Sequence, residues 1–303
     1  MKQSKDGVEQ LGEFCPYSKI DKVLAFAFDR IEEVFKTKKS VTGIPSGFYA
    51  LDDITTGFQP SDFVIIASRP SVGKTTLALN MAAHIAFREH RPVAFFSMET
   101  WDAVLAQRLI SSEAMVDGKK MRNGFLAAED FRRILDVTRA MVEAPFFFVD
   151  EPNIKFHELC SRIRELRARE GVEIVFIDRL ERIDFGNGSL PRHEQISEIS
   201  RSLKTLAYEL RIPIVVLCGL RQETDRSYPT LAGLGDSGPI EQDADLVMFL
   251  NRKPSPKRKK SGEGESAEDG IPTELVITKQ RNGPLGVIDL VLRSKYTRFV
   301  PLE

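Results

Sequence analysis

The sequence feature that most constrains this chain is a phosphate-binding loop near residue 70. An apolar run at 63–67 leads into Ser68-Arg69-Pro70-Ser71-Val72-Gly73-Lys74-Thr75-Thr76, and a helical segment follows. In such a loop, backbone N–H groups and a helix N-terminus surround phosphates, the lysine reaches the β- and γ-phosphates, and the hydroxyl binds Mg²⁺. Ser68 stands where the usual pattern begins with glycine. We therefore predict a P-loop NTPase that binds ATP through Ser68 to Thr76, with Lys74 on the phosphates and Thr75 on the metal.

Apolar runs and helical segments alternate through most of the chain. Strands are predicted at 63–67, 93–97, 146–149, 173–177, 213–217 and 246–250, and helices at 75–89, 100–113, 128–143, 155–170 and 194–210. Continuous apolar strands that alternate with helices are typical of a mainly parallel sheet covered on both faces. Short segments at 274–278, 286–292 and 298–302 predict an antiparallel extension of that sheet. The predicted fold class is α/β.

An amphipathic helix is predicted ahead of this domain, at 18–35. Its apolar residues recur every three or four positions, and a polar stretch at 36–40 follows. Such a helix must bury its apolar face, either on the core of its own domain or on a neighbouring subunit. We expect residues 1–40 to form a frayed N-terminus and this helix, and residues 41–303 to form the ATPase domain.

Three carboxylates are candidates for chemistry at the phosphates. Asp178 and Asp150 each end an apolar run, as the Mg²⁺-binding aspartate of a P-loop protein does. The pattern alone leaves both open. Glu99 follows the run at 93–97, where a carboxylate could activate the attacking water, or where it could simply belong to the N-terminal turn of the next helix.

Composition sets broad limits on location and partners. The formal net charge is −1, which neither requires nor excludes a nucleic-acid partner, since a local channel can be basic. Three separated cysteines indicate neither a disulfide framework nor a zinc site. The sequence has no apolar run long enough to span a membrane and no signal-peptide pattern, so we predict a cytoplasmic protein with no membrane partner. The basic stretch that begins at Arg252 is interpreted as a solvated insertion or as a contact with nucleic-acid phosphates.

Several segments together resemble the C-terminal motor domain of the DnaB-type bacterial replicative DNA helicase family. Besides the P-loop, they include Phe96-Ser97-Met98-Glu99, Ser237-Gly238-Pro239-Ile240-Glu241-Gln242-Asp243-Ala244-Asp245, and Lys279-Gln280-Arg281-Asn282-Gly283-Pro284. The resemblance extends from about residue 18 to residue 299. It implies a RecA-like P-loop NTPase preceded by a linker helix that docks on the next subunit.

The resemblance also implies a function and a set of roles. The implied function is an ATP-dependent motor that translocates on single-stranded DNA and unwinds duplex at the replication fork, with ATP and Mg²⁺ as cofactors. Asp178 becomes the metal ligand and Glu99 the base, while Lys279 and Arg281 reach the nucleotide of the neighbour in a homo-oligomer, a hexameric ring in the full-length form. Primase and a helicase loader are further partners of the family, whose N-terminal domain is not represented in these residues. DNA contacts are expected from two loops, through Arg192, Arg221, Arg226, Asp236, Ser237 and Gly238.

The chain departs from the family pattern at three places. Cys218-Gly219-Leu220 replaces Ser-Gln-Leu, whose glutamine senses the γ-phosphate; Arg179-Leu180-Glu181-Arg182 replaces Tyr-Leu-Gln-Leu; and the segment 233–238 lacks an arginine. An alternative function follows from these departures. It is an ATP-binding helicase paralogue with impaired DNA coupling that acts as a regulatory or assembly partner.

Overall fold

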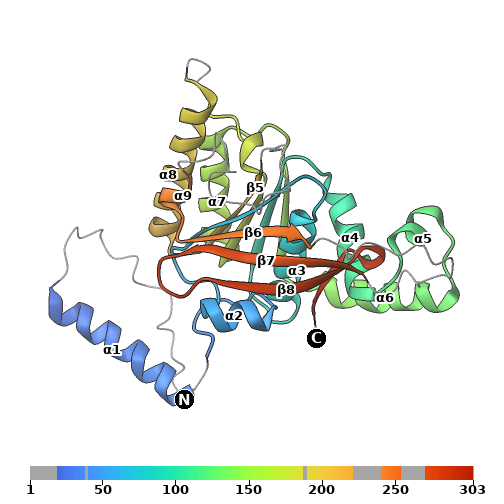
Figure 1. The fold of residues 1–303 in the computed structure, drawn as a ribbon, viewed down its shortest axis with the longest axis horizontal. Helices are drawn as coiled ribbons and strands as arrows, with labels where there is room; N and C mark the ends of the chain where they lie inside the picture. The colour runs from blue at the N-terminus through green and yellow to red at the C-terminus, as the bar shows by residue number, and fades with distance from the viewer. Residues whose placement is uncertain (1–18, 38–39, 187–189, 221–239, 254–269, 303) are drawn as a thin grey trace, which may run out of the picture. The chain divides into compact units, whose positions relative to one another are not determined.

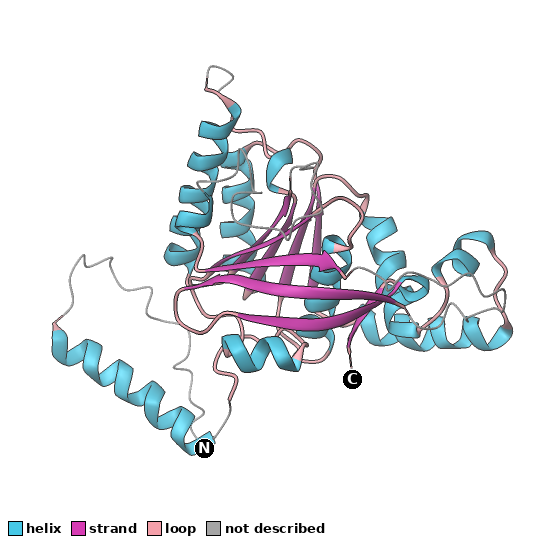
Figure 2. Ribbon diagram, in the orientation of Figure 1, coloured by secondary structure: helices cyan, strands magenta, loops and turns pink. Residues whose placement is uncertain are grey.

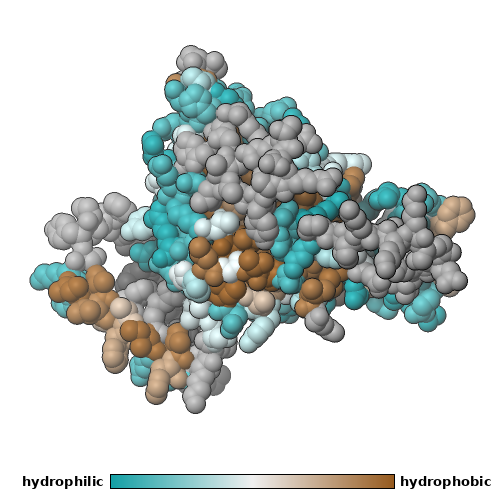
Figure 3. All heavy atoms as spheres, in the orientation of Figure 1, coloured by the Kyte–Doolittle hydropathy of each residue, from teal (hydrophilic) through white to brown (hydrophobic). Residues whose placement is uncertain are grey.

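The computed structural model describes residues 19–37, 40–186, 190–220, 240–253 and 270–302. The chain divides into two units, Met1–Thr42 and Gly43–Glu303. The first unit contains α1 (Ile20–Thr37), whose apolar residues Ile20, Leu24, Phe28, Ile31 and Phe35 are exposed. Figure 3 shows apolar side chains gathered along this helix. The predicted helix is therefore present, about two residues later than expected.

The second unit is built around one sheet of nine strands (Figure 1). The strand order is β3-β2-β4-β5-β1-β6-β7-β8-β9. The first six strands in this order are parallel: β3 (Phe146–Asp150), β2 (Val93–Ser97), β4 (Ile174–Asp178), β5 (Ile214–Gly219), β1 (Phe63–Ser68) and β6 (Leu246–Arg252). The last three, β7 (Ile271–Gln280), β8 (Gly286–Arg293) and β9 (Arg298–Pro301), run antiparallel. This order confirms the predicted α/β, RecA-like sheet with its antiparallel extension.

Helices cover both faces of the sheet, as Figure 2 shows. Strand β1 explains why both faces need cover: Val64 and Ile66 join one hydrophobic cluster, and Phe63 and Ile65 join the other. The first cluster includes residues of α2 (Tyr49–Thr55), α3 (Lys74–Phe87) and α4 (Asp102–Ala114). The second includes residues of α7 (Phe156–Glu170) and α8 (Arg192–Leu210). Burial on both faces accounts for the unbroken apolar strands of the sequence.

Several short or peripheral elements complete the unit. These are α5 (Gly118–Asn123), α6 (Ala128–Val142), α9 (Ile240–Asp243) and the 3-10 turns at Leu180–Arg182 and Ser294–Tyr296. Of the helices, α2, α5 and α9 are not predicted by the sequence pattern. None of the helices within the described ranges is long and apolar enough to cross a membrane.

Candidate nucleotide-binding site

The P-loop lies between the carboxyl end of β1 and the amino end of α3. Ser71 and Gly73 both have positive φ, 62° and 114°, and these two residues turn the chain sharply into the helix. A Cβ on Gly73 would lie 3.1 Å from the Phe299 ring, so glycine suits both the conformation and the space. No side chain caps the N-terminus of α3. Its first N–H groups are therefore available to an anion, as the sequence predicts.

A cavity of about 390 Å³ opens in front of this loop. Most of the predicted loop residues line it, together with residues that the sequence does not indicate: Arg108, Arg122, Leu292, Ser294 and Thr297. Arg108 comes from α4 and Arg122 from α5. These two guanidinium groups add positive charge to the walls of a cavity that Lys74 also lines, which favours a polyphosphate ligand.

Thr75, which lines this cavity, and its partner Asp178 suit a magnesium ion. Thr75 Oγ1 donates a hydrogen bond of 2.8 Å to Asp178 Oδ2. The other oxygen of that carboxylate, Asp178 Oδ1, is buried without a hydrogen-bond partner. Burial raises the pKa of Asp178, and the bond from Thr75 opposes that rise. A buried acceptor of this kind fits a cation.

A cation beside Asp178 would need further ligands from outside the protein. Within the described ranges, no group of three or more His, Cys, Asp or Glu side chains could hold a metal ion. Mg²⁺ is commonly held by one or two protein ligands together with phosphate oxygens and water. Thr75 and Asp178 provide such a partial set.

Asp150, the competing aspartate, lies elsewhere. It ends β3, at the edge of the sheet, and its Oδ2 accepts a bond of 3.1 Å from the backbone N–H of Asp102 at the start of α4. Asp178 ends β4, which lies between β2 and β5 inside the sheet, and it accepts the hydrogen bond from Thr75. The geometry thus favours Asp178 for the metal.

Glu99 follows β2 at the end of the sheet where the parallel strands finish, which we call the carboxyl edge. Its carboxylate pairs with a cation. Arg179 Nη1 lies 3.2 Å from Glu99 Oε2, and Arg179 Nε lies 3.1 Å from Glu181 Oε2. Glu181 Oε1 in turn accepts a bond of 2.6 Å from the backbone N–H of Gly219. Two of the three departures from the family pattern, at 179–182 and at 219, therefore meet at one point.

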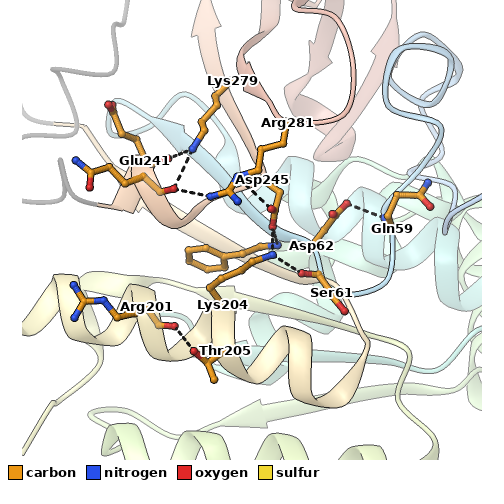
Figure 4. A network of polar contacts seen from close by, with 12 residues as sticks. Gln59, Ser61, Asp62, Arg201, Lys204, Thr205, Glu241, Asp245, Lys279 and Arg281 are labelled. Carbon is orange, nitrogen blue, oxygen red and sulfur yellow. Dashed lines mark hydrogen bonds and ion pairs between the residues drawn. The ribbon is translucent and has the colours of Figure 1, made fainter. Parts of the chain in front are cut away.

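Lys279 and Arg281 lie at the opposite end of the sheet, where the parallel strands begin and which we call the amino edge (Figure 4). Lys279 pairs with Val247, the second residue of β6, and β6 runs parallel to β1. Both cations bind carbonyl groups of α9: Lys279 Nζ donates to Glu241 O and Gln242 O, and Arg281 Nη2 donates to Gln242 O at 2.8 Å. Within one chain, the structure does not bring these two residues to the P-loop.

Hydrogen bonds and ion pairs around Asp245 link the residues of the amino edge. Lys204 Nζ lies 2.6 Å from Asp245 Oδ2 and donates to Ser61 O at 2.9 Å. Asp245 also accepts a bond of 2.8 Å from the N–H of Phe63 and pairs with Arg281 at 3.5 Å. The nearby Asp62 has its pKa raised to about 6 by burial, with a smaller contribution from Asp245.

Of the predicted DNA contacts, the structure describes Arg192. This residue begins α8, and its guanidinium donates to Gln195 Oε1 at 2.8 Å, to Glu181 O at 2.9 Å and to Ile183 O at 3.2 Å. These bonds tie the start of α8 to the 3-10 turn after β4. Arg221, Arg226, Asp236, Ser237 and Gly238 lie outside the described residues.

Comparisons with known proteins agree with this geometry. A family model described as the DnaB-like helicase C-terminal domain matches residues 43–301. The replicative DNA helicase DnaB of Treponema pallidum is 42% identical over 270 residues, which are 89% of this chain and 58% of that protein. The replicative DNA helicase DnaC of Bacillus subtilis is 36% identical over 95% of this chain and 63% of its own length. This chain thus spans about three fifths of the length of these relatives.

Solved structures give the same result. One solved ATPase domain superposes with a TM-score of 0.83 at 30% identity, covering 95% of this chain and 100% of that one. A DnaB-like replicative helicase, solved in a study of its interactions with primase, superposes with a TM-score of 0.80 at 31% identity, covering 95% of this chain and 68% of its own.

Proposed function

This chain belongs to the family of DnaB-like helicase C-terminal domains, and we propose on that basis that it is an ATP-driven motor that moves along single-stranded DNA and unwinds duplex at the replication fork. The observation that carries the proposal is the meeting of Lys74, Thr75, Asp178 and Glu99 at the carboxyl ends of the parallel strands, beside a cavity that Lys74 and Thr75 line. Topology brings these residues together from three strand ends.

Each residue of this group has a role in hydrolysis. Backbone N–H groups of the loop and of the first turn of α3, together with the Lys74 ammonium, hold the phosphates. Thr75 and Asp178 would hold Mg²⁺, which would supply positive charge to the phosphates. Glu99 accepts the proton of the attacking water. Arg108 and Arg122 hold further phosphate oxygens from the opposite wall of the cavity.

Lys279 and Arg281 act on the nucleotide of a neighbouring subunit. Strand β1 has six residues, so its two ends are roughly 20 Å apart, and a side chain at the amino edge does not reach the P-loop of its own chain. A neighbour placed with its carboxyl edge against this amino edge would receive both cations. This arrangement supports a homo-oligomer, in which the exposed apolar face of α1 is buried on an adjacent subunit and six subunits close a ring.

Single-stranded DNA is proposed to contact Arg192, the first residue of α8, and Arg221, Arg226 and residues 236–238. The structural neighbour that was studied with primase supports primase as a partner. A helicase loader is proposed as a further partner, and the location is proposed to be cytoplasmic.

The test is the steady-state ATPase rate of the chain with and without single-stranded DNA, at fixed low salt because phosphate contacts are salt-sensitive. We expect DNA to raise the rate severalfold and Glu99→Gln to reduce it by about 10²- to 10⁴-fold. Glu170→Gln, at an exposed position on α7, is the matched control and should change nothing.

Gly219 favours a second candidate, the helicase paralogue with impaired DNA coupling. Position 219 ends β5 beside Ser68 and has no side chain that could sense the γ-phosphate. An assembled chain that binds ATP and whose turnover DNA does not change would support this regulatory or assembly partner over the motor.

A further inference from the structure

Arg179 is a cation at the carboxyl edge, beside the proposed base Glu99. It follows Asp178, and its guanidinium lies between two carboxylates, Glu99 at 3.2 Å and Glu181 at 3.1 Å. Its side chain is 30% exposed, so it is neither buried in the core nor free in solvent. None of the roles assigned above uses it.

The guanidinium lies against Gly219, in the direction in which a side chain at that position would extend. Gly219 pairs in register with Ser68, the first residue of the P-loop. A Cβ built on Gly219 would lie 3.4 Å from Arg179 Nη2 and 3.5 Å from Glu181 Oε1. The guanidinium therefore occupies the space into which a side chain from the end of β5 would point.

The same guanidinium lies within electrostatic reach of the metal and phosphate residues. Arg179 follows Asp178 in the chain, and Asp178 Oδ2 accepts the 2.8 Å bond from Thr75 Oγ1. A γ-phosphate held by Lys74 and Thr75 would thus arrive next to Arg179. Arginine binds phosphate through two parallel N–H groups. Glu99 engages only Nη1 of this guanidinium, and a phosphate group would compete with Glu99 for the same cation.

We propose that Arg179 binds the γ-phosphate of ATP in its own subunit, and that this contact releases Glu99 to accept a proton from water. Without a γ-phosphate, the ion pair holds Glu99 away from that task. Glu181 keeps Arg179 Nε throughout, and Glu181 is itself fixed by the N–H of Gly219 at 2.6 Å. The bond from Arg179 Nε to Glu181 is therefore kept while Nη1 leaves Glu99. The inference rests on the proposed nucleotide site and adds to it a residue that distinguishes ATP from ADP.

The test measures dissociation constants for ADP and for ATPγS, both with Mg²⁺, on the full chain. We expect Arg179→Ala to weaken ATPγS by about 10- to 100-fold, the range of a charged hydrogen bond, and to leave ADP within about twofold. Arg179→Lys keeps the charge without the planar fork and should fall between the two. Arg182→Ala, at an exposed neighbouring position, is the matched control and should change neither constant.

A second variant tests the geometry. Gly219→Gln in the Arg179→Ala background supplies a side chain to the vacated space and should recover part of the preference for ATPγS. Equal weakening of ADP and ATPγS by Arg179→Ala, or no weakening of either, would overturn the inference while leaving the motor intact. Failure of the parent chain to bind either nucleotide would instead overturn the proposed function, and this inference with it.

Discussion

The charged groups at the carboxyl edge and the amino edge of the sheet differ in how many partners they have within the chain. At the carboxyl edge, Asp178 keeps one buried oxygen without a partner and Lys74 faces an open cavity. At the amino edge, Asp245 is bonded to Lys204, Arg281 and the N–H of Phe63. One edge is therefore incomplete by itself and the other is satisfied within its own chain. The difference separates groups arranged for a ligand from groups that also stabilise the fold.

The largest effect is expected at the amino edge, from Arg281→Ala. If Arg281 acts on the nucleotide of a neighbour, its loss should lower the ATPase rate of the assembled chain by about 10³- to 10⁵-fold. Binding of ATP by the isolated chain should not change, because Arg281 lies far from its own P-loop. Rate measurements on the assembly and equilibrium binding on the monomer check this. Arg201→Ala, on the exposed side of α8, is the control; an unchanged rate in the assembled variant would remove Arg281 from the mechanism.

At the carboxyl edge, Asp178→Asn should weaken Mg²⁺-dependent nucleotide binding by about 10- to 100-fold. The free energy of unfolding without nucleotide should stay equal or rise, since burial already disfavours the charged form of this carboxylate. Titration calorimetry and thermal unfolding measure the two quantities. A destabilised variant with unchanged binding would show that Asp178 is structural.

At the amino edge, Lys204→Met should lower stability and leave nucleotide binding unchanged, which is the opposite of the result expected for Asp178→Asn. It removes one partner of Asp245 and leaves a carboxylate that is only 12% exposed with less compensation. The expected loss is about 1–3 kcal/mol in the free energy of unfolding, with nucleotide binding to the monomer retained. Denaturant unfolding measures it. Equal stability of parent and variant would mean that this network contributes nothing to the fold.

The smallest effect concerns pH. The pKa of Asp62 is raised from 3.8 to about 6. Between these two pH values, this carboxyl group is protonated in the folded state and ionised in the unfolded state. The contribution of this group to stability therefore falls as pH rises from 3.8 to about 6 and stays constant above that. Asp62→Asn, whose amide oxygen can still accept the bond from the Gln59 N–H, should remove that fall.

The check is the difference in unfolding free energy between Asp62→Asn and the parent, measured at about pH 4 and about pH 7. The variant should gain relative to the parent at the higher pH. A difference that does not change with pH would show that Asp62 titrates normally.

Much of the fold follows from local sequence, because strands buried on both faces are continuous apolar runs with recognisable ends. The short helices α2, α5 and α9 do not, since seven, six and four residues carry too little periodicity. The choice between Asp178 and Asp150 also needs the structure. Both end an apolar strand, and the hydrogen bond from Thr75 shows that Asp178 is the one beside it.

The rest of the site depends on contacts between distant parts of the chain. Arg108 and Arg122 join the cavity from helices well after the P-loop, and no local pattern marks them. The meeting of Arg179 with Glu99 and Gly219 likewise depends on β2, β4 and β5 ending at one edge. The sequence shows that positions 179 and 219 depart from the family pattern, but not that they are neighbours.

In the proposed assembly, the incomplete carboxyl edge of one subunit is completed by the amino edge of another. Mixing Lys74→Ala chains with Arg281→Ala chains tests it most directly, through the ATPase rate of the assembled mixture. Each variant alone should be close to inactive. The mixture should regain activity, because a Lys74→Ala chain offers an intact Arg281 to the intact P-loop of its neighbour. A mixture that assembles and stays inactive would contradict the account.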